Sequence, residues 1–544
     1  MQSPQSPVVR AAIAAALVLA GTGWLGRSPA GAAAAAFSND DKTILHVLNR
    51  IGFGPRPGDV ERVKALGLQR YIDEQLRPER IADPNMPARL GALATLGLSN
   101  REIADTYELP QLQARQAQKK DAAQTGDNAP AAGDNVDKGR MPDPLQQKAN
   151  RVVVELSDQK ILRAVYSERQ LQEVLTDFWF NHFNVDARKG PDRFMLTEYE
   201  REVIRPRVLG KFHDLLEADA KSPAMLFYLD NWMSADPNGP HKQPMAAPRV
   251  GRGRFGGLMF PPAARPNAQG KNAPKGLNEN YGRELMELHT LGVDGGYTQK
   301  DVTEVARAFT GWTIQNPRLG GGFRFEPRIH DEGQKIVLGH VIKAGGGERD
   351  GEQVLDILAK HPSTARFIAT KLVRRFVSDT PPPTLVDRAA ARFRETDGDL
   401  REVMRTILTS PEFFAPEAYR AKVKTPFEFV ASALRATGAD IQDATPLVRE
   451  MQQLGQPLYM CQPPTGYKDT ADAWVNTGAL VNRMNFSLLL ASNKVPRVTV
   501  ADPSTVNTIL GDDVSETTRS TIAKATSAPQ MAALTLGAPE FQRR

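Results

Sequence analysis

The sequence has only one cysteine, Cys461, among 544 residues. A single thiol cannot form a disulfide within the chain. It also excludes a CxxCH haem site, a cysteine-based zinc site and an iron–sulfur cluster. The stability of the fold must therefore come from its core, and a chain of this length can bury a large one.

Sequence motifs of common enzymes are absent too. The chain contains no HExxH, GxSxG, P-loop or EF-hand pattern, so the usual markers of zinc proteases, serine hydrolases, nucleotide-binding loops and calcium sites are missing. Residues 251–256 match GxGxxG, but neither a preceding buried strand nor a helix beginning at the last glycine is evident. We therefore expect no dinucleotide site there.

The chain has only a small excess of positive charge. It carries 69 lysines and arginines against 63 aspartates and glutamates, which gives a formal net charge of +6. A nucleic-acid-binding protein usually shows a clustered basic stripe, and none stands out, so we expect no nucleic-acid partner. Hydrophobic residues make up 41% and charged residues 24%, which is typical of a folded soluble protein and excludes a wholly disordered or fibrous chain.

The first 36 residues have the pattern of a secretory signal peptide. Arg10 precedes an apolar run of about 15 residues, and small-residue cleavage sites follow at Ala32 and Ala36. A bilayer span needs about 20 apolar residues, and no later run reaches that length, so we expect no transmembrane segment in the mature chain. One arginine precedes the run, which does not indicate the twin-arginine route. We expect general secretion and a periplasmic or extracellular protein.

Capped amphipathic segments dominate the rest of the sequence and predict a mainly α-helical, multi-helix body. Apolar residues at 323–325 and 336–338 surround a polar turn at 331–333, which predicts one small β-hairpin. The expected helices span residues 41–49, 57–65, 69–76, 150–167, 168–183, 279–291 and 299–310, and helices continue through 351–414 and 426–491.

Two stretches lack periodic apolar residues and are predicted to be long flexible insertions. Residues 116–144 are rich in Ala, Gln, Asp, Gly and Lys, and residues 236–276 are rich in Pro, Gly and Arg. The expected organisation is a signal peptide at 1–36, an N-terminal helical segment at 37–115, a flexible insertion at 116–144 and a main helical domain at 145–544 with a long loop at 236–276.

His182 lies on an apolar helical stripe. Leu171, Leu175, Phe178 and His182 are spaced i, i+4, i+7 and i+11, so the imidazole is expected to point inward. Two interpretations are open at this stage. His182 is either a core histidine bonded to a backbone carbonyl, or a metal ligand or general base in a closed pocket.

The helix expected over 279–291 carries Glu284 and His289. On an α-helical wheel Glu284 falls between two leucines, so a carboxylate is held against the core and should be paired, metal-bound or protonated. His289 borders the same face. An arginine partner from another helix is the structural alternative, and the spacing from Glu284 to His289 does not match the Glu-x-x-His signature of di-iron bundles.

His330 and Asp331 lie on the predicted hairpin turn, close to Lys335. The turn brings an imidazole, a carboxylate and an ammonium group within a few residues, and loops often display functional side chains. A plain polar turn is the alternative interpretation.

Several motifs together resemble the bacterial family called domain of unknown function 1800 (DUF1800), from about Ile44 to Arg544. They are Leu48–Pro55 (LNRIGFGP), Asp177–Asn184 (DFWFNHFN), Asn278–Gly292 (NENYGRELMELHTLG), Tyr297–Val302 (YTQKDV) with Ala306–Trp312 (ARAFTGW), and His330–Lys335 (HDEGQK). Shorter matches follow at His361–Ala365, Leu454–Pro457, Pro463–Gly466 and Pro539–Gln542.

The resemblance implies a large secreted bacterial protein with a mostly helical fold. Members are often encoded beside a sulfatase-like family, so a sulfatase-like protein encoded nearby is the partner that the resemblance implies. The family supplies no accepted catalytic residues, and none is transferred to this chain.

Two hypotheses follow. In the first, the chain is a metal-assisted hydrolase or has a ligand-binding pocket at the cell envelope. His182, Glu284, His330 and Asp331 would be catalytic, and His182, Glu284 and His289 would bind a divalent zinc, iron or manganese ion. In the second, it is a noncatalytic envelope assembly or binding protein whose buried polar residues form a structural network.

Overall fold

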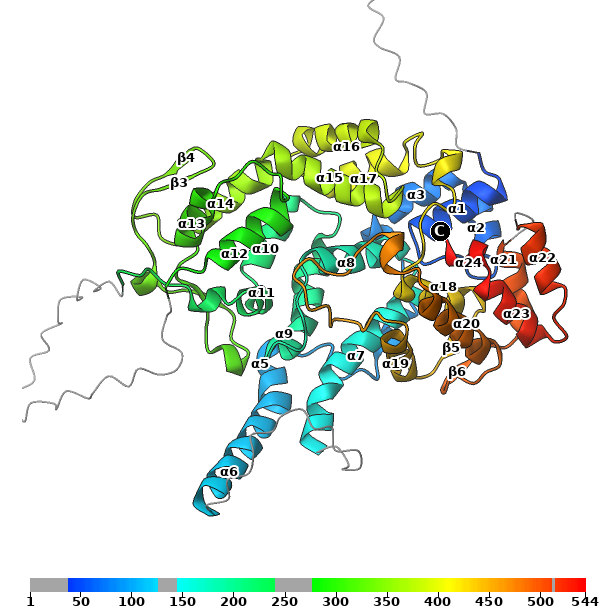
Figure 1. The fold of residues 1–544 in the computed structure, drawn as a ribbon, viewed down its shortest axis with the longest axis horizontal. Coiled ribbons are helices and arrows are strands. Elements are labelled where there is room, and N and C mark those ends of the chain that lie inside the picture. Colours follow the sequence, from blue (N-terminus) through cyan, green and yellow to red (C-terminus); the bar gives the residue numbers. More distant parts are fainter. Residues whose placement is uncertain (1–37, 126–143, 240–275, 511–513) are drawn as a thin grey trace, which may run out of the picture. The chain divides into compact units, whose positions relative to one another are not determined.

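Apolar side chains at helical spacing form the elements that dominate this protein. The computed structural model describes residues 38–125, 144–239, 276–510 and 514–544 (Figure 1). These residues are mainly helical and include three two-stranded sheets. The predicted mainly α-helical fold class is confirmed.

The helices of the first part are α1 (Asp41–Arg50), α2 (Asp59–Leu66), α3 (Leu68–Gln75), α4 (Met86–Leu90), α5 (Asn100–Ile103), α6 (Leu109–Thr125), α7 (Pro144–Tyr166), α8 (Gln170–His182), α9 (Asp192–Glu198), α10 (Phe212–Ala220) and α11 (Pro223–Tyr228). The helices of the middle part are α12 (Glu279–Glu284), α13 (Gln299–Ala308), α14 (Arg349–Lys360), α15 (Pro362–Phe376), α16 (Pro383–Glu395), α17 (Leu400–Leu408), α18 (Pro426–Ala436) and α19 (Thr445–Gln453). The last helices are α20 (Thr477–Ala491), α21 (Asn507–Leu510), α22 (Glu516–Ile522), α23 (Ala528–Gly537) and α24 (Pro539–Gln542).

Two helices form the centre of the core. Every residue of α18 is buried, and α8 is buried over most of its surface. Helices that are buried on all sides lie inside a protein, and the charged residues that they carry, such as Glu428 and Arg435 of α18, need partners there. The side chains that α8 presents, including His182, therefore lie deep in the fold, as the apolar stripe predicted.

The N-terminal helices are joined to this core by a buried arginine of α18. The Arg435 guanidinium donates hydrogen bonds to the backbone carbonyls of Gly54 and Val165, at 2.6 and 2.7 Å, and forms an ion pair with Asp59 at 3.1 Å. The described residues from Ser38 to Arg544 form one compact unit. The segment expected over 37–115 therefore packs, from Ser38 onward, with the residues that follow it.

The strands near residue 330 pair differently from the single hairpin expected over 323–338. Strand β2 (Phe323–Phe325) pairs antiparallel with β1 (Trp312–Ile314), and β3 (Lys335–Val337) pairs with β4 (His340–Ile342). A third small sheet joins β5 (Asp440–Ile441) to β6 (Val498–Thr499). Each strand has two or three residues, which is too short for the sequence pattern to select its partner.

Several sequence predictions concern residues outside the described ranges. The expected signal peptide at 1–36 lies there completely, as does most of the loop expected at 236–276. In the insertion expected at 116–144, the structure places residues 116–125 in helix α6, and residues 126–143 lie outside the described ranges. Within those ranges, none of the helices combines the length and apolar character needed to cross a membrane.

Candidate functional site

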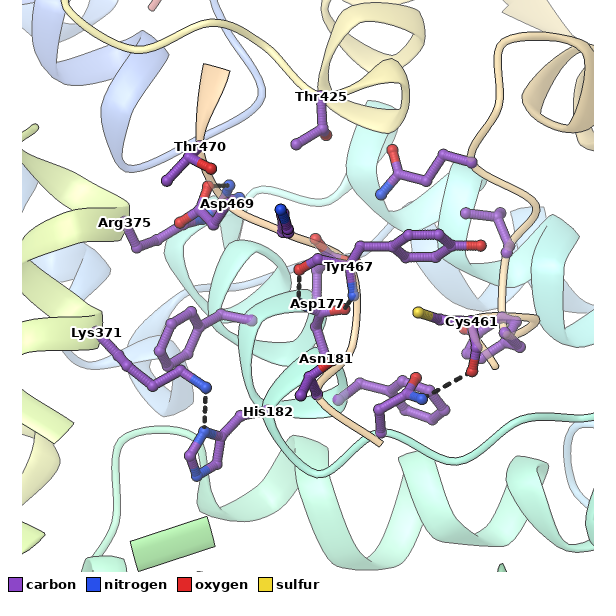
Figure 2. Close-up of a pocket in the computed structure, with 18 of the residues that line it drawn as sticks. Asp177, Asn181, His182, Lys371, Arg375, Thr425, Cys461, Tyr467, Asp469 and Thr470 are labelled. Carbon is purple, nitrogen blue, oxygen red and sulfur yellow. Dashed lines mark hydrogen bonds and ion pairs between the residues drawn. The ribbon is translucent and has the colours of Figure 1, made fainter. Parts of the chain in front are cut away.

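A cavity of about 350 Å³ lies beside α8, α15 and the chain segment 456–470 (Figure 2). Helix α8 supplies one wall, because the DFWFNHFN motif runs through its last turns. Asp177, Asn181 and His182 from this motif line the cavity, together with the phenylalanines at 178 and 180. The motif that resembles DUF1800 therefore forms part of a cavity wall.

Two asparagines of this motif hold the opposite segment in place. The Asn181 amide donates to the Tyr467 carbonyl and accepts from the Tyr467 backbone N–H, both at 2.7 Å. The Asn184 amide donates to the carbonyls of Cys461 and Pro463, at 2.8 and 2.9 Å. These side chains position the segment that completes the cavity, so their amides are already occupied by the protein backbone.

A glycine allows this segment to approach α8 closely. Gly466 has a φ of +71°, and a Cβ atom there would lie 2.2 Å from the Asn181 carbonyl oxygen. Any other residue at 466 would push the segment away from α8. The match over Pro463–Gly466 thus has a steric reason in the structure.

His182 forms a hydrogen-bonded pair with Lys371 from α15. The His182 Nδ1 atom lies 2.7 Å from the Lys371 Nζ atom, and its Nε2 atom lies 3.1 Å from the His289 carbonyl oxygen. Burial, followed by the charge of Lys371, lowers the pKa of His182 well below its ordinary range. The ring is therefore neutral, with Nε2–H donating to the carbonyl and Nδ1 accepting from the lysine.

Lys371 itself is partly buried and lines the cavity. Burial lowers its pKa to about 8, against the opposing effect of Asp469 and with a further lowering by Arg374. About half of the Lys371 side chains are therefore uncharged near pH 8. This amine can bind an anion when protonated and can exchange a proton with a ligand when neutral.

Cationic side chains outnumber carboxylates in the cavity wall. Lys371, Arg374 and Arg375 come from the last two turns of α15, and the wall also contains Lys160 and Lys468. The carboxylates that line the cavity are those of Asp177 and Asp469.

Only some of these cations have anionic partners. Lys160 pairs with Asp177 at 2.7 Å, and Arg375 pairs with Glu428 at 2.6 Å and Asp469 at 3.5 Å. Among the described residues, neither Lys371 nor Arg374 has a carboxylate at ion-pair distance. The cavity therefore has cationic character that the protein does not neutralise.

The thiol of Cys461 also lines this cavity. Burial and then Asp186 raise its pKa to about 11. Only thiolates act as nucleophiles or metal ligands, so this cysteine contributes an uncharged, unreactive surface near neutral pH.

The structure brings His182 and His289 together but gives His289 a different environment from that predicted. Their ring centroids are 6.3 Å apart, and His289 Nδ1 lies 3.7 Å from the Asp219 carboxylate. Burial raises the pKa of Asp219 to about 8, although the Tyr199 hydroxyl that donates to it at 2.6 Å opposes this. His289 is buried and does not line the cavity.

Glu284 is not held against the core as the α-helical wheel predicted, because the helix changes its winding. Leu285–Thr290 form a π-helical turn, in which the Leu291 N–H donates to the Met286 carbonyl at 2.7 Å. Wider turns rotate His289 inward and leave Glu284 half-buried. Burial and then Glu287 raise the pKa of Glu284, while Arg283 lowers it.

His330 and Asp331 belong to a different cluster from His182. His330 Nε2 and Lys335 Nζ both contact the Asp350 carboxylate, at 3.2 and 2.7 Å, and all three side chains are fully buried. Asp331 pairs with Arg307 at 2.7 Å. His330 is thus enclosed rather than displayed on a loop, and neither it nor Asp331 lines the cavity.

The predicted metal ligands do not form a metal-binding group. In the part of the chain that the structure describes, no three histidine, cysteine, aspartate or glutamate side chains are arranged to hold a metal ion. His182 has both ring nitrogens engaged, by Lys371 and by a carbonyl. The arrangement favours anion binding over metal binding.

The sequence patterns did not predict that Lys371, Arg374 or the segment 456–470 would belong to the candidate site. The short matches at Leu454–Pro457 and Pro463–Gly466 pointed to that segment, but they were not connected to α8. On the sequence, the basic residues of α15 are indistinguishable from surface cations.

Comparison with known proteins identifies one family. The model of a protein family of unknown function, DUF1800, matches residues 46–543. No curated protein and no solved structure matches the chain significantly.

Proposed function

Because this chain belongs to the DUF1800 family, whose function is not established, we propose a function from the cavity beside His182: it binds a small anionic ligand. We further propose that it does so outside the cytoplasm, since the first 36 residues have the pattern of a secretory signal peptide. The ligand class is a small polar molecule that carries a carboxylate, phosphate or sulfate group.

The observation that carries this proposal is the pair of unneutralised cations on α15. Lys371 and Arg374 line the cavity, and no described carboxylate forms an ion pair with either. A cation removed from bulk water without a counter-ion is costly, and a bound anion would supply the missing charge. Arginine and lysine are the side chains that proteins use to bind carboxylate and phosphate groups.

The rest of the wall suits a polar ligand of limited size. Hydroxyl and amide groups, such as those of Thr465 and Gln456, alternate with the rings of Tyr459 and Tyr467. A cavity of about 350 Å³ is at the lower end of the range for small-molecule sites. We therefore propose a ligand of the size of a single acidic sugar rather than a polymer.

Binding is proposed in preference to metal-assisted hydrolysis because the chemistry of the wall differs from that of a metallohydrolase. Lys371 and His182 form an amine–imidazole pair, and the wall lacks a grouping of carboxylates and free imidazoles. Such a pair can orient an anion and accept or return a proton. It provides no Lewis acid.

Calorimetric titration of the purified protein with inorganic phosphate, inorganic sulfate and galacturonate tests this proposal. We expect at least one of the three to bind, and the Lys371→Met variant to bind it at least about tenfold more weakly, because one charge-assisted hydrogen bond is worth roughly 1.5–3 kcal/mol. Arg366→Met is the matched control. Arg366 lies on the same helix, is exposed and pairs with Asp387, so its removal should leave binding unchanged.

Two results would contradict the proposal. One is the failure of all three anions to bind the wild-type protein at millimolar concentrations. The other is equal affinity of Lys371→Met and Arg366→Met for the anion that binds. Circular dichroism of each variant checks that the helical content is retained.

The proposed location has its own test. Expression of the full chain in a Gram-negative host followed by N-terminal sequencing should give a periplasmic or secreted protein that begins after Ala32 or Ala36, because these positions follow small-residue cleavage sites. Recovery of a cytoplasmic protein that still begins with Met1 would contradict export.

A further inference from the structure

A second and larger cavity, of about 660 Å³, is lined in part by residues of the segment 456–470, which also lines the first cavity. Leu458 lines both cavities. The second is formed by α6, α7, α19 and the residues that lead into α9. Its volume lies within the range of sites that enclose small organic ligands.

One part of the wall of this second cavity is aliphatic. Apolar side chains come from three helices and from the closing segment: Leu112, Val153, Val154, Val448, Leu458 and Met460. Burial of apolar ligand surface against such a wall is favourable, at roughly 25 cal/mol for each Å² removed from water. In the wall of the first cavity, the apolar surface comes mainly from aromatic rings, such as those of Phe178 and Tyr459.

Arginines are placed around this aliphatic wall, and most of them have no anionic partner. Arg115 donates to the Gln146 side chain at 3.0 Å, and Arg193 donates to the Gln111 side chain at 2.7 Å. No ion pair joins Arg115, Arg193 or Arg318 to a carboxylate of the described chain. The fourth, Arg188, pairs with Asp186 at 2.8 Å.

Arg193 has a further unsatisfied group. Its Nε atom is buried and has no hydrogen-bond partner. Buried donors in folded proteins are nearly always paired. An anion in the cavity would complete the hydrogen bonding of this guanidinium group after a small rotation of the side chain.

One carboxyl group lines the cavity, that of Glu108, which is 6% exposed. It ends a π-helical turn, Ala104–Glu108, and such turns often occur at functional sites. Within the described ranges it accepts no hydrogen bond and forms no ion pair. Burial raises its pKa to about 7, while Arg193 and Arg318 oppose this.

We infer that this second cavity binds an amphiphilic carboxylate, of the kind found in a free fatty acid. The apolar chain would lie against the aliphatic wall, and the carboxylate head would lie between Arg193, Arg318 and the protonated carboxyl group of Glu108. Two carboxyl groups at one site share a proton readily, because both cannot ionise together. This chemistry favours a carboxylate head over a phosphate.

Binding of a carboxylate at this site should take up a proton. The charged groups that face Glu108 are Arg193 from α9 and Arg318 from the turn after β1, with Arg115 and Arg188 elsewhere on the wall. When Glu108 ionises, its carboxylate competes with the ligand for these arginines. Because the pKa of Glu108 is about 7, the affinity for a carboxylate should fall about tenfold between pH 6 and pH 8.

Titration calorimetry with laurate, below its micelle concentration, tests the inference on the full chain. We expect one laurate per protein, at least tenfold weaker binding to Arg193→Gln and pH-independent binding to Glu108→Gln. Arg70→Gln, an exposed arginine on α3 that pairs with Glu74, is the matched control and should bind as the wild type does. Circular dichroism confirms that each variant is folded.

Titrations with two further ligands of the same chain length test whether the site recognises a carboxylate head. Dodecanol binding as tightly as laurate would show that no anionic head is recognised, and dodecyl phosphate binding more tightly would show a phosphate site; either overturns the inference. No laurate binding to the wild type, or equal binding to Arg193→Gln, also overturns it. Lys371 does not line the second cavity, so Lys371→Met should retain laurate binding even though it binds the small anion more weakly.

Discussion

The Glu428→Gln variant is expected to be about 3–5 kcal/mol less stable than the wild-type protein at pH 7. Glu428 lies in the first turn of the buried helix α18 and is 4% exposed. Its carboxylate forms ion pairs with Arg375 at 2.6 Å and with Arg544 at 2.9 Å. Glutamine removes the charge and leaves two buried guanidinium groups without it.

Glutamine is the informative replacement because it preserves the other role of Glu428. The Glu428 carboxylate also accepts the backbone N–H of Thr425 at 2.8 Å, as part of a capping box. A glutamine carbonyl oxygen can accept the same bond. The loss of stability therefore reports the charge and not the helix cap.

The same carboxylate should make the stability depend on pH in the acid range. Burial would raise the pKa of Glu428, but Arg375 and then Arg544 hold it down to about 2, below its ordinary value of 4.5. A group with a depressed pKa in the folded state stabilises the fold above its unfolded pKa. This contribution, roughly 3 kcal/mol, is lost as the pH falls from about 4.5 towards 2.

Urea denaturation at several pH values measures both effects. Asp387→Asn provides the control, because Asp387 and its partner Arg366 are about 60% exposed and an exposed ion pair contributes at most about 1 kcal/mol. A Glu428→Gln variant that unfolds at the wild-type urea concentration would show that the buried pairs contribute no net stability.

The inward position of His182 was predictable because α8 keeps ordinary α-helical winding. The stripe of Leu171, Leu175, Phe178 and His182 is buried along its whole length. Local spacing was sufficient there, since a helix of regular pitch places residues four and seven apart on one face. The same reasoning failed for Glu284, because the π-helical turn after it changes the rotation per residue and the sequence gives no local sign of this.

The composition of the cavity wall could not be derived from local pattern. Lys371 meets His182 across 189 residues of sequence, and the distinction between a surface cation and a cavity cation depends on which element packs against α15. Asn181 and Asn184 stood out beside His182, but their role in fixing the segment 461–467 depends on contacts with backbone atoms. Backbone groups are present at every residue, so the sequence cannot identify them as partners.

The sequence also left open whether His330 belongs to a reactive site or to a structural network, and an Asp350→Asn variant separates the two. Asp350 is completely buried. Its carboxylate accepts a hydrogen bond from Lys335 Nζ at 2.7 Å and lies 3.2 Å from His330 Nε2. Burial would raise the pKa of Asp350, but the hydrogen bonds from His330 and Lys335 lower it. The carboxylate is therefore ionised and is the counter-ion of a lysine that has no exposed surface.

Asp350→Asn should destabilise the protein by about 3–5 kcal/mol, because the buried Lys335 ammonium group then loses its nearer carboxylate and keeps only that of Asp331, at 3.8 Å. The double variant Lys335→Met, Asp350→Leu should be more stable than Asp350→Asn, since it removes both charges and retains apolar volume. Denaturant unfolding of the three proteins gives the comparison. Anion binding in the cavity beside His182 should be unchanged in each variant under conditions in which it is folded, because neither residue lines that cavity.

The opposite pattern would support the sequence-based hypothesis that His330 and Asp331 carry chemistry. In that case Asp350→Asn would unfold like the wild type and yet lose ligand binding or turnover. A charge at a reactive site can be removed with little effect on stability, because such sites are arranged for their ligand at some cost to the fold. A completely buried ion pair contacts no ligand, so removal of one of its charges changes the stability of the fold and not ligand binding.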